Sequence, residues 1–157
     1  MQAVLALDVV SDAFDLSDLL GGDARAFQPH ISILPRFETP DLDAAMFAHL
    51  RPSLGLTVEL CGPEDNGTGL WWCECLPEMQ GHRELTALHN ESTWLLAGAA
   101  CPVTPNFWGN GYRPHLTLGH EIDLPLLPRR LEVTVVSICL YVIQEQPSLA
   151  VQRWNLL

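Results

Sequence analysis

The sequence predicts one α+β domain of antiparallel character, spanning residues 1–157. The expected strands and helices follow one another at short spacing without a regular strand–helix–strand repeat, which is typical of this class. With 48% hydrophobic and 17% charged residues, the chain can bury a core of its own. Two similar short strands, at His30 and His115, lie 85 positions apart, a little over half the chain. This offset indicates an internal duplication.

The N-terminal half is expected to contain four strands and one helix. The first strand is an apolar run, and the second alternates polar and apolar side chains after a proline, so that one face is polar. The helix should follow Pro40 and Asp41, because proline and acidic residues favour the first helical turn. In order, these five elements are expected at residues 3–10, 29–35, 42–50, 54–60 and 70–76.

The C-terminal half begins with the most regular helix of the chain, from residue 82 to about 98, whose leucines form an apolar stripe. A loop rich in proline, asparagine and glycine then leads into a strand at 112–119. Residues 124–130 contain two prolines and are expected to be irregular. A long buried strand at 131–144 and an edge strand at 151–157 complete the fold.

Charge and composition exclude several classes of function. The net charge of −11 leaves little positive surface to replace the counterions of duplex DNA or long RNA, so a small nucleotide or a short oligonucleotide is the expected partner. All eight basic residues are arginines. The lack of lysine excludes a P-loop, a lysine Schiff base and a nucleotidyl-lysine intermediate. Arginine still suits phosphate, because its planar fork donates two hydrogen bonds at once.

The cysteines and the apolar segments predict a cytoplasmic protein with no membrane partner, and a monomer is expected. The five cysteines are odd in number and form no Cys-x-x-Cys pair, so buried reduced thiols are the simplest account. The apolar N-terminus has no basic flank and is interrupted by Asp8, unlike a signal peptide. The longest apolar stretch, residues 133–143, is too short to cross a bilayer.

The two matching strands carry the residues that predict a reaction. Side chains two apart on a strand share a face, so His30 projects with Ser32 and His115 with Thr117. If the halves are related by an approximate two-fold axis, two imidazoles and two hydroxyls meet in one cleft. In-line displacement at phosphorus needs a base and an acid on opposite sides, and histidine can serve as either near neutral pH. The hydroxyls can donate to the non-bridging phosphate oxygens, so neither a metal nor another cofactor is expected.

These motifs give the chain its resemblance to the 2H phosphoesterase superfamily. That superfamily includes the bacterial 2′-5′ RNA ligase-like proteins and the 2′,3′-cyclic nucleotide phosphodiesterases. Its hallmark is a pair of His-x-Thr/Ser-x motifs, which here read His30-Ile31-Ser32-Ile33 and His115-Leu116-Thr117-Leu118. The resemblance implies a bilobal, pseudo-duplicated fold, with two antiparallel sheets around a central cleft and helices outside. It also implies a metal-independent phosphodiesterase that acts on 2′,3′-cyclic phosphates or 2′-5′ linkages.

Six further residues are candidates for substrate binding. Where many members of the superfamily carry an arginine after the second motif, this chain has His120, so Arg36 and Arg113 are also candidates for holding phosphate. Aromatic residues just before the second motif can stack on a base, although core packing is the alternative interpretation for each of them. These aromatic residues are Phe107, Trp108 and Tyr112.

Several alternatives stay open at this level. The same site can serve to degrade cyclic di- or trinucleotide signals, or the cleft can bind a nucleotide phosphate without turning it over. The two histidines can instead be core residues on unrelated strands. A zinc site formed by His30, His115 and His120 is conceivable, but no carboxylate or cysteine lies at ligand spacing.

Overall fold

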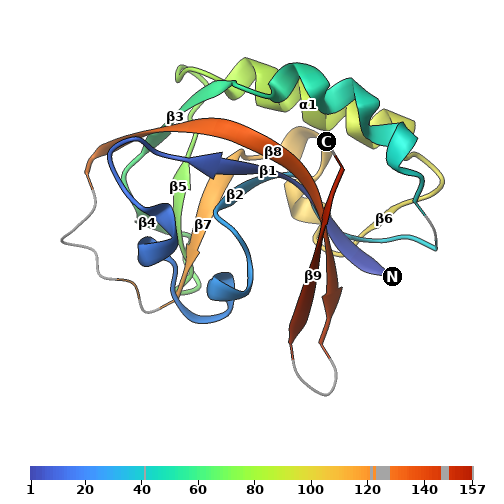
Figure 1. Ribbon diagram of the computed structural model, residues 1–157, viewed down its shortest axis with the longest axis horizontal. Helices are drawn as coiled ribbons and strands as arrows, with labels where there is room; N and C mark the ends of the chain where they lie inside the picture. Colours follow the sequence, from blue (N-terminus) through green and yellow to red (C-terminus); the bar gives the residue numbers. More distant parts are fainter. Residues whose placement is uncertain (41, 121, 123–127, 146–148, 157) are drawn as a thin grey trace.

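The computed structural model describes residues 1–40, 42–120, 122, 128–145 and 149–156. Its strands form one antiparallel sheet in the order β3-β8-β1-β2-β7-β5-β4, with β6 paired to β2 and β9 to β8 (Figure 1). The strands are β1 (Gln2–Val10), β2 (His30–Glu38), β3 (Thr57–Cys61), β4 (Glu64–Asp65), β5 (Trp71–Glu74), β6 (Cys101–Pro102), β7 (His115–Gly119), β8 (Arg130–Gln144) and β9 (Ala150–Asn155).

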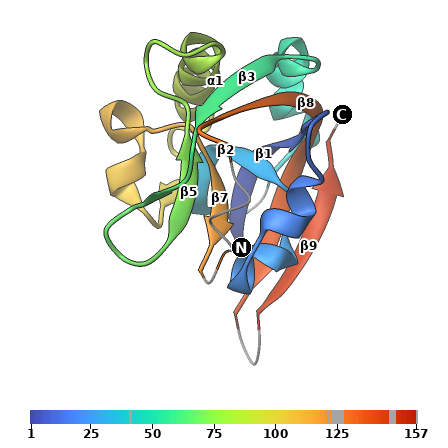
Figure 2. The ribbon, with the colours of Figure 1, turned by 90° about the vertical axis from the view of Figure 1, so that its left-hand side faces the viewer.

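The helical segments flank this sheet. The α-helix α1 and the long 3₁₀ helix η3 lie side by side over one face, and the short helices η1 and η2 lie on the other side of the sheet (Figures 1 and 2). Two further 3₁₀ turns, η4 and η5, precede β7. The bounds are η1 (Leu16–Leu19), η2 (Gly22–Ala26), η3 (Ala44–Ser53), α1 (His82–Leu95), η4 (Pro105–Phe107) and η5 (Gly109–Gly111).

The predicted α+β class with antiparallel strands is confirmed, but the expected pair of sheets is wrong. The two motif strands, β2 and β7, are hydrogen bonded to each other, with Ile31 opposite Leu116. Because this pairing joins the two halves directly, the strands form a single curved sheet. The irregular segment expected at 124–130 falls largely outside the described residues.

Alternation along the strands gives the sheet two different faces. One face packs under α1 and η3 in the main core, which includes Leu5, Leu7 and Ile31 from the strands and Leu85 from α1. Full burial of such a side chain contributes about 1.5–3 kcal/mol. The opposite face, named here the site face, carries the second and smaller cluster, with Val4, Ala6, Cys139, Tyr141 and Ile143. The polar members of both motifs lie on the site face.

Candidate active site

The two motif strands bring four polar side chains together at the centre of the sheet. Since β2 and β7 are antiparallel with Ile31 opposite Leu116, a local two-fold axis relates the motifs. This register places His30 across from Thr117 and Ser32 across from His115. All four side chains are partly buried, and the isoleucine and leucine between them are fully buried on the other face. Each histidine therefore lies beside the hydroxyl of the other motif.

Both motif histidines make the same hydrogen bond to the backbone. His30 Nδ1 is 2.8 Å from the carbonyl oxygen of Gln28, and His115 Nδ1 is 2.6 Å from that of Arg113. A carbonyl only accepts, so Nδ1 carries the hydrogen and Nε2 keeps its lone pair in the neutral ring. In each case the carbonyl belongs to the residue before a proline, which holds that residue in an extended conformation. The Pro-His dipeptides thus fix the tautomer that acid–base chemistry at Nε2 requires.

Aromatic rings surround each imidazole. The ring of His115 lies 4.3 Å from that of Trp72 and 6.3 Å from that of Phe107, centroid to centroid. Desolvation by these neighbours, with a smaller contribution from the charge of His30, lowers the pKa of His115 to about 4. The ring of His30 lies between Phe27, at 5.3 Å, and Tyr141, at 5.1 Å. Both histidines are consequently neutral at pH 7.

Each motif histidine has a carboxylate as its strand neighbour, Asp8 for His30 and Glu74 for His115, but the positive charge of Arg113 also acts on His115 and opposes that of Glu74. Desolvation lowers the pKa of His30, and the nearby charge of Asp8 opposes this shift. Asp8 is 5% exposed and is the direct neighbour of His30 in the β1–β2 pairing. The neighbouring charges therefore favour the protonated form of His30 more than that of His115.

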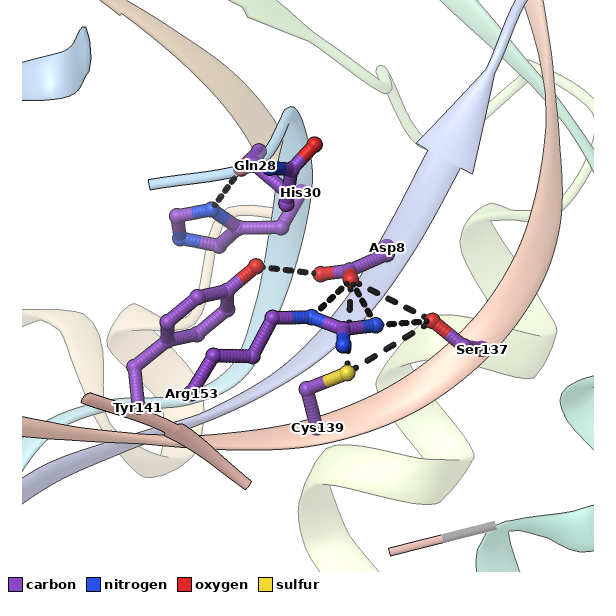
Figure 3. A network of polar contacts seen from close by, with 7 residues as sticks. All are labelled: Asp8, Gln28, His30, Ser137, Cys139, Tyr141 and Arg153. Atoms are coloured by element: carbon purple, nitrogen blue, oxygen red, sulfur yellow. Dashed lines mark hydrogen bonds and ion pairs between the residues drawn. The ribbon is translucent and has the colours of Figure 1, made fainter. Parts of the chain in front are cut away.

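Asp8 is the centre of a polar network on the site face (Figure 3). Its carboxylate accepts hydrogen bonds from Tyr141 Oη at 2.6 Å and from Arg153 Nε at 2.8 Å. Ser137 Oγ and Cys139 Sγ donate to the same carboxylate at 3.2 and 3.3 Å. The Tyr141 ring that this network holds is one of the two rings against His30. This network was not predicted from the sequence, although an aspartate inside an apolar strand indicates that its carboxylate needs a partner.

A cavity of about 410 Å³ opens beside the motifs. His30 and Thr117 line it together with Arg36 and His120, while Ser32 and His115 lie on the same sheet face outside its lining. The rest of its wall is largely apolar. This cavity, named here the histidine cavity, combines an apolar wall with a few polar groups, as sites for small organic ligands do.

Two of the three predicted phosphate ligands lie at the histidine cavity. Arg36 Nε donates to Gln2 Oε1 at 2.8 Å, and its guanidinium forms an ion pair of 2.6 Å with Glu145. The exposed ring of His120 is held by a 2.8 Å hydrogen bond between Nδ1 and the carbonyl oxygen of Gly69. Arg113, by contrast, lies outside this cavity and forms two hydrogen bonds with Glu74, at 2.8 and 2.7 Å.

The three predicted aromatic residues fall into two groups. Phe107 is half-buried, with its ring 6.3 Å from that of His115. Tyr112 is buried, stacks on His89 at 4.0 Å and donates from its hydroxyl to the Ser32 carbonyl oxygen. Trp108 packs against Phe37 and His89. Tyr112 and Trp108 therefore support the motif strand from the core side.

Within the described ranges, no three His, Cys, Asp or Glu side chains are grouped as ligands of a metal ion. None of the helices in the same ranges combines the length and the apolar character needed to span a bilayer.

Comparison with known proteins gives a likeness at the level of the fold. No protein-family model matches the chain, and no curated protein matches it. The fold is similar to that of a solved structure described as "Crystal structure of phosphoesterase", with a TM-score of 0.55 over 98% of this chain and 97% of the other. The two sequences are 15% identical, so this likeness concerns the arrangement of the elements.

Proposed function

We propose that the protein is a metal-independent phosphodiesterase that acts on 2′,3′-cyclic phosphates or 2′-5′-linked nucleotides. One observation carries this proposal: two histidines related by a local two-fold axis, each with Nδ1 bonded to a backbone carbonyl and Nε2 free for proton transfer. The fold likeness to a phosphoesterase supports the same reaction class. The acidic net charge favours a small substrate over a long nucleic acid.

The environments of the two histidines suggest their roles. His115, with a pKa of about 4, is unprotonated over most of the pH range and takes a proton from the attacking water. His30, which lies beside Asp8, donates a proton to the departing ribose oxygen. The negative charge of the bound phosphodiester further favours protonated His30 in the complex.

In the proposed mechanism, the remaining polar groups of the site bind the phosphate. Ser32 and Thr117, each across from a histidine, donate to the non-bridging oxygens as negative charge builds up on them. Arg36 and His120 are the candidates on the wall of the histidine cavity for further contacts with phosphate.

Substitution of each histidine tests the proposal. His30→Gln and His115→Gln should each lower the hydrolysis of adenosine 2′,3′-cyclic phosphate by at least about 100-fold, the usual scale of general acid–base catalysis. His82→Gln, at the start of α1, is the matched control and should keep full activity. Product formation is followed by mass spectrometry, folding by circular dichroism, and EDTA should have no effect. Full activity in either motif variant would contradict the proposal, and tight binding without turnover by the wild type would favour a binding module.

A further inference from the structure

A second cavity adjoins the histidine cavity on the site face. It has a volume of about 510 Å³, and Gln28 lines both cavities. Asp8, on its wall, is the strand neighbour of His30, and Figure 3 shows Asp8, Gln28 and His30 close together. We name it the Asp8 cavity. A ligand at His30 can therefore extend into it without leaving the protein surface.

The lining of the Asp8 cavity disfavours a phosphate. Arg153 is the single cationic side chain among the described residues that line it, and its guanidinium is bonded to the Asp8 carboxylate at 2.8 Å. Asp15 adds a further negative charge, since it caps η1 and lies on the same wall. A phosphate placed here would meet two carboxylates and a guanidinium that is already neutralised.

The same lining suits a nucleoside. Its apolar side chains can pack against a base, and its hydroxyl, amide and carboxylate groups can pair with ribose hydroxyls and with the N–H groups of a base. The apolar members include Val10, Phe14, Pro29 and Val136, and the polar ones include Ser11, Ser17 and Gln28. The volume falls in the range of cavities that hold small organic ligands.

We propose that the Asp8 cavity binds the leaving nucleoside of a linear phosphodiester, so that the preferred substrate is a 2′-5′-linked oligonucleotide and not a cyclic mononucleotide. This inference rests on the proposed function and on the position of the cavity next to His30. Water attacks phosphorus and gives a proton to His115, the bond from phosphorus to the ribose oxygen breaks, and His30 protonates that oxygen. The products are a nucleotide with a terminal phosphate and a nucleoside with a free hydroxyl, the latter in the Asp8 cavity.

Tryptophan substitutions at the rim of the Asp8 cavity test the inference. Val10 and Val136 line it, are about half exposed and lie on or at the end of strands, where tryptophan is tolerated. The wild type should show a kcat/KM at least tenfold higher for 2′-5′-linked adenylyl-adenosine than for adenosine 2′,3′-cyclic phosphate. Val136→Trp and Val10→Trp should remove this preference and leave hydrolysis of the cyclic phosphate within twofold. Gln152→Trp, an exposed β9 position outside both cavities, should change neither rate.

The outcomes separate the inference from the proposed function. If the wild type hydrolyses both substrates equally, or if the tryptophan variants slow both equally, the Asp8 cavity is not a nucleoside subsite, although the phosphodiesterase function stands. If the wild type hydrolyses neither, the proposed function fails. Calorimetry with adenosine then decides on the subsite alone: we expect binding that Val136→Trp weakens at least fivefold, and equal affinity in wild type and variant would overturn it.

Discussion

Backbone carbonyls, and not carboxylates, hold the proton on Nδ1 of both motif histidines. The carbonyl oxygens of Gln28 and Arg113 can only accept, so each imidazole changes its protonation at Nε2 alone. The two histidines differ in their charged neighbours, because the charge of Asp8 raises the pKa of His30, whereas at His115 the charge of Arg113 opposes that of Glu74. In the proposed mechanism, these differences in desolvation and charge decide which histidine gives a proton and which takes one.

This difference predicts an acidic optimum for kcat/KM. The base, His115, must be unprotonated, so the rate should rise with pH through about 4. The acid, His30, must be protonated, so the rate should fall as pH rises through its pKa, which is lowered below 6.5. A pH profile measured with adenosine 2′,3′-cyclic phosphate should therefore peak between these two values. A rate that still increases from pH 7 to 8 would contradict the proposed roles.

The hydroxyl across from His30 predicts a second result. Thr117→Val keeps the shape of the side chain but removes its donor to phosphate, and loss of one such donor lowers kcat by about 100-fold. Thr117→Ser restores the donor and should keep most of the activity. Steady-state kinetics of both variants separate the loss of the hydroxyl from a change in packing, because a fall of similar size in both would point to packing.

The residues of the site could be predicted to different degrees. His30, Ser32, His115 and Thr117 follow from two local patterns, because alternation on a strand is a property of neighbouring residues. Asp8 and Tyr141 are 133 positions apart, and their contact arises only when β1 pairs with β8. Single-sequence patterns carry no information on such a pairing, so the network beside His30 was beyond prediction.

Among the elements, β2 shows how a proline shapes the site. The strand was expected to end at residue 35, but it continues to Glu38 through Pro35. The pairing with β1 shifts register here, since Ala3 lies opposite Phe37 and Leu5 opposite Leu34. Proline is tolerated at such a bulge because no ladder hydrogen bond needs its missing N–H. The continuation past the bulge carries Arg36 to the histidine cavity.

The positions of the helical elements were predicted from the sequence, but the type of helix was not always predicted. The expected helix at 42–50 is the 3₁₀ helix η3, which includes Pro52 and ends after Ser53. On α1, the ring of His89 is fully buried. Its Nδ1 donates to the Ile33 carbonyl oxygen at 2.7 Å, and its Nε2 accepts from the N–H of Gly109 at 2.9 Å. His89 thus ties α1 to β2 and to the segment before β7.

Removal of these two hydrogen bonds should destabilise the protein. His89→Phe preserves a flat ring against Tyr112 but leaves the buried carbonyl and N–H without partners, which we expect to lower the free energy of unfolding by about 2–4 kcal/mol. Urea unfolding followed by tryptophan fluorescence measures this change. The control, His82→Gln, should stay within about 0.5 kcal/mol of the wild type. Equal stability of the two variants would show that the His89 bonds contribute nothing.

At the scale of the whole molecule, the single sheet explains how a duplicated pattern forms one site. Direct pairing of β2 with β7 sets the distance between the two motifs by the spacing of adjacent strands, about 5 Å, and not by the packing of two lobes. The expectation of two sheets followed from the family resemblance, whereas the duplication itself was compatible with either arrangement. The local two-fold axis within one sheet still brings the four polar side chains to one face.

This compact arrangement should make the stability of the protein depend on pH. Burial lowers the pKa of His30, His89 and His115 in the folded state, while the unfolded chain titrates near 6.5. Between the two values the unfolded state binds more protons, so stabilisation is complete above pH 6.5 and is lost as pH falls. For His115, with a folded pKa of about 4, the loss amounts to at most about 3 kcal/mol. Urea unfolding from pH 7 to 4.5 should therefore show that the free energy of unfolding falls more steeply for the wild type than for His115→Gln. Carboxylate titration is the same in both proteins, so the difference between them reports on His115. Parallel profiles would mean that this imidazole is as easily protonated in the folded as in the unfolded chain.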